Sequence, residues 1–302
     1  MEKISYKDQT NCFKLSNGAF DVIVATDFGP RILFYGFTGG ENILGEHPDA
    51  KAMTELGEWK AWGGHRLWTA PEVNPRSYAP DNQPVEFTIE NENSIRLVQY
   101  AEPPTNIEKE MIVTLEAEGS GVTVAHKITN RNLWEIEVAP WALTIMNGDG
   151  GGEAIFPQEP YRSWDDYLLP ARQLVLWHYT DLSDPRWTLG KKFLRLRSDA
   201  GQSAPQKIGL ANKQNWAAYH RNDMVFIKRF VYEEGATYPD FGSNNETYTA
   251  GSFIELETLA PLQRIEIGAS ATHQERWSLF NKIEIGVTDD DIEAALSACL
   301  VQ

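Results

Sequence analysis

Residues 121–129 read GVTVAHKIT, and their apolar side chains recur at every second position. Successive side chains of an extended chain point to opposite faces, so one face carries two valines, an isoleucine and His126. The turn-forming run 118–121 separates this segment from a second strand-like run, residues 107–115. The pattern predicts an antiparallel hairpin. It also places His126 on an apolar face, where we expect a hydrogen-bonded histidine rather than a ligand-binding one.

The same period of two continues along most of the chain, in short β-rich runs separated by Gly, Pro, Asn and Asp. Pro140 interrupts one long run and should lie at a bulge or an edge, because proline has no amide hydrogen. Only residues 288–300 carry a helical stripe, with Thr288 as its cap. The further expected strands cover residues 20–24, 31–35, 85–90, 94–100, 134–146, 193–197, 206–210, 216–220, 224–230, 252–259, 264–267 and 272–279.

These runs predict a single all-β domain over residues 1–302, built from large antiparallel sheets with one short C-terminal helix. The chain has 27 Lys and Arg against 43 Asp and Glu, a net charge of -16, which should repel nucleic acid and anionic membranes. Its first nine residues, MEKISYKDQ, contain no apolar export segment, and no run reaches the roughly 18 apolar residues of a membrane helix. We therefore expect a cytoplasmic protein without nucleic-acid or membrane partners.

The two cysteines, Cys12 and Cys299, lie near opposite ends of the chain, without the spacing of a zinc site or a disulfide framework. We expect no metal and no cofactor. His273, Glu275 and Trp277 fall on one face of a late strand, which we interpret as a salt-bridged surface rather than a metal site.

Residues 62–72 read WGGHRLWTAPE and combine a glycine pair, an imidazole, a guanidinium, a carboxylate and two indoles. The glycines permit a turn or a close backbone approach, and indoles beside charged groups suit a concave ligand site. We interpret the stretch as part of such a site. The alternative is a surface turn that leads into a strand, with Trp68 in the core and with Arg66 and Glu72 solvated.

Residues 251–259 read GSFIELETL, and in a strand Glu255 and Glu257 share one face with their Cα atoms about 6.6 to 7 Å apart. Two carboxylates on one face repel each other, so one pKa should rise and that group could act as a general acid or base. The alternative is a solvent-facing strand with two hydrated glutamates.

Two further segments are candidates for function, and one of them has side chains suited to carbohydrate. Residues 238–247, YPDFGSNNET, supply amides, acids and rings that match sugar hydroxyls and their apolar faces, unless they form only a polar loop. Residues 157–187 are irregular and rich in aromatic and acidic side chains, and long irregular segments of compact domains are often functional.

Motifs spread over nearly the whole chain resemble the bacterial DUF4380 proteins. They are GPRI at 29–32, GGHRLWTAPE at 63–72, APWALT at 139–144, SDPRW at 183–187, YPDFG at 238–242 and ELET at 255–258. The resemblance implies the galactose mutarotase-like supersandwich, a large twisted β domain with a sugar site on its concave face.

A more distant resemblance, to aldose 1-epimerases, implies catalytic roles. Their base lies in a Leu-Glu-Thr-like strand near the C-terminus, so that role passes to Glu257. Their acid is a histidine on a central strand, but residues 137–141 read EVAPW and contain none. His65 is then the expected acid for opening the sugar ring. The expected ligand contacts are Arg66, Trp68, Glu72, Arg186, Asp240, Asn245, Glu246 and Glu255.

Three functions follow from these residues. The first is a carbohydrate-binding protein that interconverts sugar anomers, as an aldose 1-epimerase-like isomerase does. The second is a carbohydrate-binding module without catalysis, which the missing central histidine favours. The third is a lyase-type enzyme acting on oligosaccharides or uronates. In each the partner is a small-molecule or oligosaccharide ligand.

Overall fold

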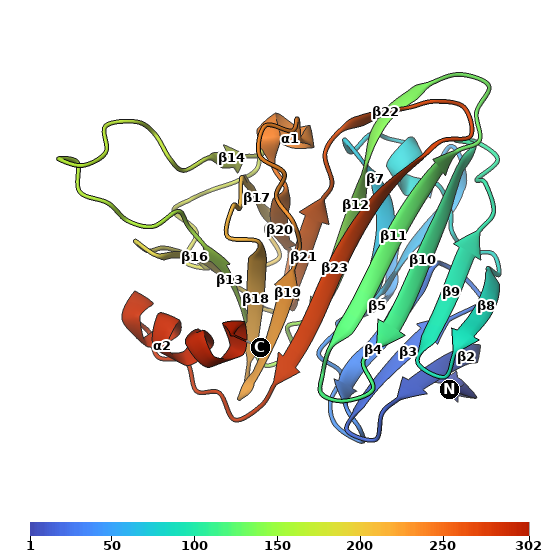
Figure 1. The fold of residues 1–302 in the computed structure, drawn as a ribbon, viewed down its shortest axis with the longest axis horizontal. Coiled ribbons are helices and arrows are strands. Elements are labelled where there is room, and N and C mark those ends of the chain that lie inside the picture. The colour runs from blue at the N-terminus through green and yellow to red at the C-terminus, as the bar shows by residue number, and fades with distance from the viewer. Residues whose placement is uncertain (302) are drawn as a thin grey trace.

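The computed structural model describes residues 1–301, except for the side chains of residues 48 and 49. Strands make up 49% of the residues and helices 6%, which confirms the all-β prediction. The strands form two large antiparallel sheets and one separate hairpin (Figure 1). No helix among the described residues is long and apolar enough to span a membrane.

The first sheet has 11 strands. In spatial order they are β1 (Glu2–Tyr6), β2 (Gln9–Ser16), β3 (Phe20–Ala25), β4 (Arg31–Phe37), β7 (His65–Ala70), β12 (Ile136–Asn147), β21 (Phe253–Leu259), β20 (Asn245–Thr249), β17 (Gln206–Leu210) and β14 (Leu174–Leu176), and β22 (Gln263–Ile265) pairs with one end of β12.

The second sheet has 10 strands. Their order is β15 (Trp187–Leu189), β16 (Phe193–Arg197), β13 (Glu153–Pro157), β18 (Trp216–Arg221), β19 (Met224–Arg229), β23 (Ser270–Phe280), β11 (Val122–Asn130), β10 (Ile107–Leu115), β9 (Ser94–Gln99) and β8 (Glu86–Asn91). The long strand β23 crosses the middle of the molecule between β19 and β11 (Figure 1).

The two sheets enclose the main hydrophobic core. Alternate residues of each strand contribute to it, as Leu67 of β7 and Val124 of β11 illustrate. Pro140 of β12 lies where this strand changes partner: Val138 pairs with Gln263 of β22, whereas Trp141 pairs with Leu259 of β21. Pro140, which the sequence predicts at a bulge or an edge, thus lies where the strand paired with β12 on one side changes from β22 to β21.

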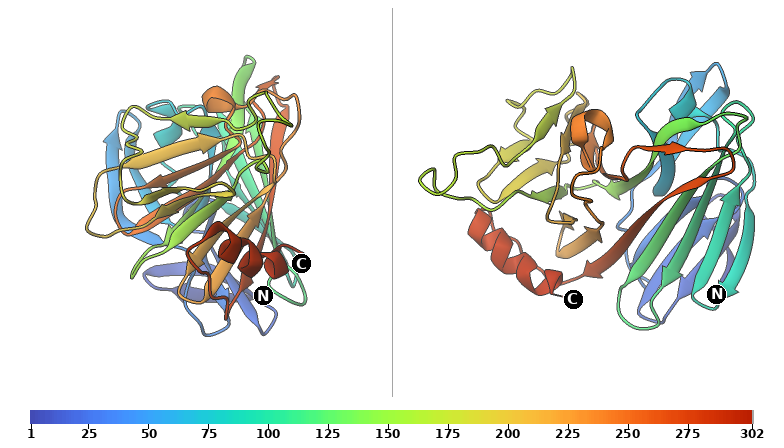
Figure 2. Two further views of the ribbon diagram at one scale, coloured as in Figure 1. Left: turned by 90° about the vertical axis from the view of Figure 1, so that its left-hand side faces the viewer. Right: turned by 45° about the horizontal axis from the view of Figure 1, so that its top comes forward.

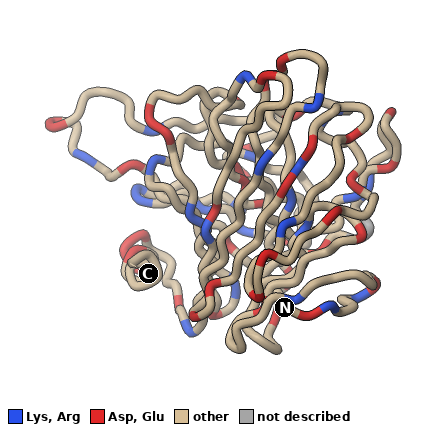
Figure 3. The backbone as a smooth tube through the Cα atoms, turned by 45° about the vertical axis from the view of Figure 1, so that its right-hand side comes forward, with Lys and Arg blue, Asp and Glu red and all other residues tan. Residues whose placement is uncertain are grey.

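The C-terminal helix α2 (Asp289–Leu300) is capped by Thr288, as its sequence predicts, and Asp291 completes a capping box with Thr288. Its stripe of Ile292, Leu296 and Cys299 packs on the outer face of the second sheet. The helix lies at the edge of the molecule, next to the C-terminus (Figure 2). A short turn, η1 (Arg76–Tyr78), and the four-residue helix α1 (Pro239–Gly242) complete the elements. Acidic and basic residues are interspersed along the chain in the view of Figure 3.

The hairpin of β5 (Glu46–Thr54) and β6 (Gly57–Gly63) is a separate two-stranded sheet. Trp62, Gly63 and Gly64 all have positive φ, at 58°, 87° and 68°, where the chain passes from this hairpin into β7. A Cβ on Gly64 would lie 2.0 Å from the Ile32 carbonyl oxygen, so no larger residue fits. The glycine pair therefore provides the close backbone approach suggested by the sequence.

Candidate functional site

A cleft of about 490 Å³ lies on the face of the first sheet that is turned away from the core. The charged residues that line the cleft are Arg66, Lys207, Glu72 and Glu255. Aromatic rings supply most of the remaining lining: Trp59, Trp68, Tyr78, Trp141, Trp177, Tyr179, Tyr248 and Phe253. Apolar clefts with a few converging polar groups are typical ligand sites.

Strand register aligns the polar side chains of the cleft in rows. In the first row, Arg66 of β7 is opposite Leu143 of β12, which is opposite Glu257 of β21, which is opposite Glu246 of β20. Directly opposite residues of an antiparallel pair point to the same face. The two glutamates and the arginine, from distant parts of the sequence, therefore share the outer face of the sheet.

A second row runs parallel to the first. Ile145 of β12 is opposite Glu255 of β21, which is opposite Tyr248 of β20, which is opposite Lys207 of β17. Glu255 and Glu257 thus lie on the same face, as their spacing predicts, and Glu255 lines the cleft directly. Both rows therefore cross the neighbouring strands β12, β21 and β20 of the first sheet.

Lys207, Glu246 and Glu257 form a buried group that we call the cleft cluster. The Lys207 Nζ atom lies 2.9 Å from an oxygen of each glutamate. Trp141 Nε1 donates a further hydrogen bond to Glu257, at 2.9 Å. The lysine ammonium also lies 4.7 and 4.9 Å from the ring centres of Trp141 and Trp177. Glu257 therefore lies beneath Lys207 and Trp141 and is itself fully buried.

Burial disfavours the charged form of both glutamates in the cleft cluster. It raises the pKa of Glu246 well above its ordinary value and that of Glu257 to about 7, against the opposing effect of the Lys207 ammonium. One ammonium cannot balance two buried carboxylates. The arrangement therefore favours a neutral, protonated carboxyl in the cluster.

Arg66 is the other cation of the cleft. Its Nη2 atom lies 3.2 Å from Glu255 Oε1, and its guanidinium stacks on Trp68 and Trp59 with ring-centre distances of 4.4 and 5.4 Å. Its Nε and Nη1 atoms are buried and have no hydrogen-bond partner among the described residues. Such donors are costly to leave unsatisfied, so they favour a ligand with acceptor oxygens.

Of three other expected contacts, Glu72 lines the cleft, whereas Asp240 and Asn245 do not. Glu72 is exposed on its wall and accepts a hydrogen bond from the Tyr78 hydroxyl. Asp240 lies in a turn with a positive φ of 48°, and burial raises its pKa beside Glu246. Asn245 is fully buried and donates to the Glu257 backbone carbonyl at 2.7 Å, so it supports the strand pairing below the cleft.

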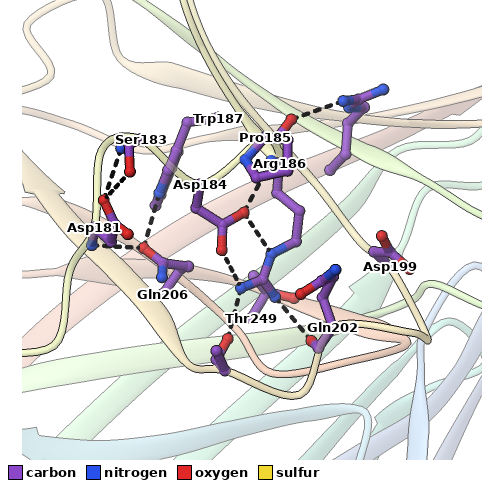
Figure 4. Close-up of polar contacts among 12 residues, drawn as sticks. Asp181, Ser183, Asp184, Pro185, Arg186, Trp187, Asp199, Gln202, Gln206 and Thr249 are labelled. Atoms are coloured by element: carbon purple, nitrogen blue, oxygen red, sulfur yellow. Dashed lines mark hydrogen bonds and ion pairs between the residues drawn. The ribbon is translucent and has the colours of Figure 1, made fainter.

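Arg186 lies elsewhere, in a loop network (Figure 4). Its guanidinium contacts both carboxylate oxygens of Asp184 and the carbonyls of Gln202 and Ala204. Trp187 Nε1 donates to Gln206, the residue before Lys207. The structure thus gives Arg186 contacts that hold the loops beside β17, and it does not line the cleft.

His65 lies on the opposite face of β7 from Arg66, because neighbouring residues of a strand point to opposite faces. It is fully buried between the sheets. Its Nδ1 lies 2.8 Å from the Thr144 hydroxyl, and its Nε2 lies 2.7 Å from Nε2 of His126. Since His126 Nδ1 donates to the His273 carbonyl, its neutral ring accepts at Nε2. The structure therefore separates His65 from the cleft.

We call the buried group of His65, His126, Lys228, His273 and Glu275 the inter-sheet cluster. Glu275 accepts from Lys228 at 2.9 Å and from Trp277 Nε1 at 2.8 Å, and the Thr258 hydroxyl donates to it as well. The expected salt-bridged surface at residues 273–277 is therefore wrong. These residues face the core, because β23 is a central strand covered by the first sheet.

His65, His126 and Glu275 place one potential metal-ligand atom each within 4.8 Å of the others. The hydrogen bonds argue against a metal there. Both oxygens of Glu275 already accept from Lys228, Thr258 and Trp277, and the lysine ammonium would repel a dication at close range. The residues fit a satisfied hydrogen-bond network better than a metal site.

Sequence reasoning did not identify several residues of the cleft. Lys207 lies in the strand QKIGL at 206–210, all of whose residues are buried, and a lysine inside a buried strand is unusual. His47 and Trp59 come from the hairpin β5–β6, whose position over the sheet no local pattern reveals. Trp177 and Tyr179 belong to the irregular segment 157–187, and they line the cleft.

Comparison with known proteins supports the fold. No family model matches the sequence, and no curated protein matches it. Among solved structures, a galactose mutarotase-like protein from Lactobacillus casei is 12% identical, with a TM-score of 0.53, covering 89% of this chain and 100% of its own. A galactose mutarotase related enzyme from Lactobacillus acidophilus is 9% identical, with a TM-score of 0.55, covering 92% and 98%.

A third structure, a galactose mutarotase-like protein from Clostridium acetobutylicum, is 10% identical, with a TM-score of 0.52, covering 93% of this chain and 98% of its own. Identities this low show the fold alone. The chain therefore has the galactose mutarotase-like fold predicted from its sequence.

Proposed function

We propose that the protein binds a carbohydrate in the cleft on the outer face of the first sheet. The observation that carries this proposal is the combination of aromatic rings and paired charges of both signs in one cavity of about 490 Å³. Rings cover the apolar faces of sugars, and charged groups hydrogen-bond their hydroxyls. Arg66, Trp68, Glu72 and Glu255 are the proposed contacts among the residues expected from the sequence. Membership in DUF4380 remains part of the proposal and rests on the motifs alone.

Tyr179 is the most informative residue for a test, because its ring lines the cleft and is 42% exposed. Tyr179→Ala should remove a stacking surface at little cost in stability and weaken binding about tenfold. Tyr167→Ala is a matched control, since that tyrosine is 54% exposed in the same segment but does not line the cleft.

The measurement is saturation-transfer NMR with a panel of aldoses and short oligosaccharides. We expect saturation of at least one sugar by the unmodified protein and by Tyr167→Ala, and a weaker signal with Tyr179→Ala. Absence of saturation from every sugar, or equal signals from all three proteins, would contradict the proposal.

Interconversion of the bound sugar's anomers is the second candidate, and the raised pKa of Glu257 favours it. The reaction needs a base for the anomeric hydroxyl and an acid for the ring oxygen. Glu257 was the base expected from sequence, and a carboxyl with a pKa near 7 could exchange protons in neutral solution. Since His65 lies behind the sheet, the acid must come from another residue.

A further inference from the structure

An exposed loop, which we call the arm, projects from the molecule at residues 159–172, between β13 and β14 (Figure 1). Trp164 is 78% exposed and Leu168 85%. The other large apolar side chains that the arm exposes are Tyr161, Tyr167 and Leu169. A cluster of exposed apolar side chains of this size marks an interaction surface.

Hydrogen bonds give the arm a defined shape. The Arg172 Nη2 atom donates to the carbonyls of Glu159 and Lys191, at 2.9 and 2.7 Å. In the middle of the arm, the Ser163 carbonyl accepts from the amide of Tyr167 at 3.1 Å. The apolar side chains are therefore presented on a preorganised loop, which lowers the entropy cost of binding a partner.

The arm offers both a cavity and side chains that could fill one. It contains a hollow of about 500 Å³, whose apolar lining comes from Tyr161, Tyr167, Leu169 and two prolines. Pockets of about 300–1,000 Å³ take up bulky groups. Trp164 and Leu168 do not line the hollow and remain exposed. The surface of the arm is thus complementary to a second copy of itself.

The charges of the arm also favour a second copy as the partner. The arm has two arginines against three acidic residues, hence a net charge of -1, whereas the whole chain carries -16. Two copies can therefore approach here with little local repulsion. A contact between identical surfaces needs both signs of charge on each surface, and Arg162, Asp165 and Asp166 supply them.

We propose that the arms of two copies pack against each other in a dimer with two-fold symmetry. Trp164 and Leu168 of each copy enter the hollow of the other, and Arg162 pairs with the partner's aspartates at 165 and 166. The five exposed apolar side chains offer on the order of 700 Å² per copy, near the roughly 800 Å² per partner of a standard interface.

The first test is sedimentation velocity of the full chain between about 1 and 100 μM. We expect a dimer whose fraction rises with protein concentration. Trp164→Glu should raise the Kd of the dimer at least about 100-fold, because it would bury an unpaired carboxylate. Trp134→Glu is the matched control, since that indole is 62% exposed but lies outside the arm.

A second test exchanges the charges of the arm. Arg162→Asp makes the arm more acidic, whereas the double variant Asp165→Lys with Asp166→Lys makes it basic. Like charges should then keep each variant monomeric on its own, whereas an equimolar mixture of the two should form a heterodimer. Recovery in the mixture is specific to contact between two arms.

Loss of the dimer in Trp164→Glu, its persistence in Trp134→Glu and its recovery in the mixture would support the proposal. A monomer at every concentration would overturn it, as would a dimer that Trp164→Glu leaves intact or a mixture that stays monomeric. A monomer that co-sediments with vesicles of phosphatidylcholine would also overturn it, because the arm would then bind a lipid surface.

Discussion

The cleft cluster and the inter-sheet cluster both place a lysine against buried carboxylates, in two different layers of the molecule. The cleft cluster lies on the outer face of the first sheet, on β17, β20 and β21, whereas Lys228 and Glu275 lie between the sheets, on β19 and β23 of the second sheet. In the inter-sheet cluster Lys228 forms an ion pair with one carboxylate, that of Glu275. The ammonium lowers the pKa of Glu275, although burial alone would raise it. In the cleft cluster Lys207 forms ion pairs with two carboxylates, those of Glu246 and Glu257, and burial raises the pKa of both. A buried carboxylate with a cation of its own stays ionised, whereas two buried carboxylates that share one cation favour protonation of one of them.

The largest expected loss of stability comes from removing the cation of the buried Lys228–Glu275 ion pair. Lys228→Met leaves Glu275 without its cation, and we expect the free energy of unfolding to fall by about 3–5 kcal/mol in urea denaturation. Lys207→Met should have a smaller effect, because the cleft glutamates can take up protons. Lys213→Met is the control, since its pair with Glu234 is exposed and contributes only about 0–1 kcal/mol. Equal losses from Lys228→Met and Lys207→Met would break the comparison.

The pH dependence of the free energy of unfolding should reveal the contribution of the buried histidines His126 and His273. Burial lowers the pKa of His126 to about 4 and of His273 to about 3, from 6.5. The unfolded chain therefore binds more protons between these values, so stability falls as pH decreases from 6.5 toward 4. We expect about 1 kcal/mol per pH unit for each histidine.

Urea denaturation across this pH range measures the slope. Glu246 and Glu257 act in the opposite direction, because their raised pKa values make stability fall as pH rises above 4.5. The difference between the slopes of the unmodified protein and His126→Gln isolates the histidine. Identical slopes would show that His126 takes up no extra proton on unfolding.

The smallest effect is expected from Glu246→Gln. Its carboxyl is the surplus acid of the cleft cluster, so a neutral amide should change the free energy of unfolding by less than about 1 kcal/mol. Glu275→Gln, the matched change in the core, removes the partner of Lys228 and should cost about 3 kcal/mol. Similar losses from the two variants would mean that the cleft cluster is as balanced as the core.

Much of the fold is local enough to be predicted. Period-two alternation identifies most strands, and Thr288 identifies the start of the C-terminal helix. The common face of Glu255 and Glu257 follows from their spacing alone. The same rule separates His65 from Arg66, although adjacency in sequence suggested one site for both.

The site depends on pairings between distant strands, which no local pattern encodes. Lys207 reaches Glu257 because β17, β20 and β21 are neighbours in the sheet. The burial of His273 and Glu275 likewise depends on the position of β23 in the middle of the second sheet, between β19 and β11. Side-chain direction is therefore predictable from sequence, whereas the partner across the sheet is not.

The hairpin β5–β6 supplies His47, Trp59 and Ala61 to the cleft but pairs with neither large sheet. Its two ends meet at Gly45 and Gly64, whose backbones are hydrogen-bonded to each other. The body of the hairpin also packs on the first sheet, through Trp59 against Trp68 and through the Ala61 carbonyl, which accepts a hydrogen bond from Arg31. The tip between Thr54 and Gly57 can therefore change in length without disturbing these contacts or the closure at the base. The tip of the hairpin is therefore the part that engineering could lengthen while the strands that carry the cleft keep their register.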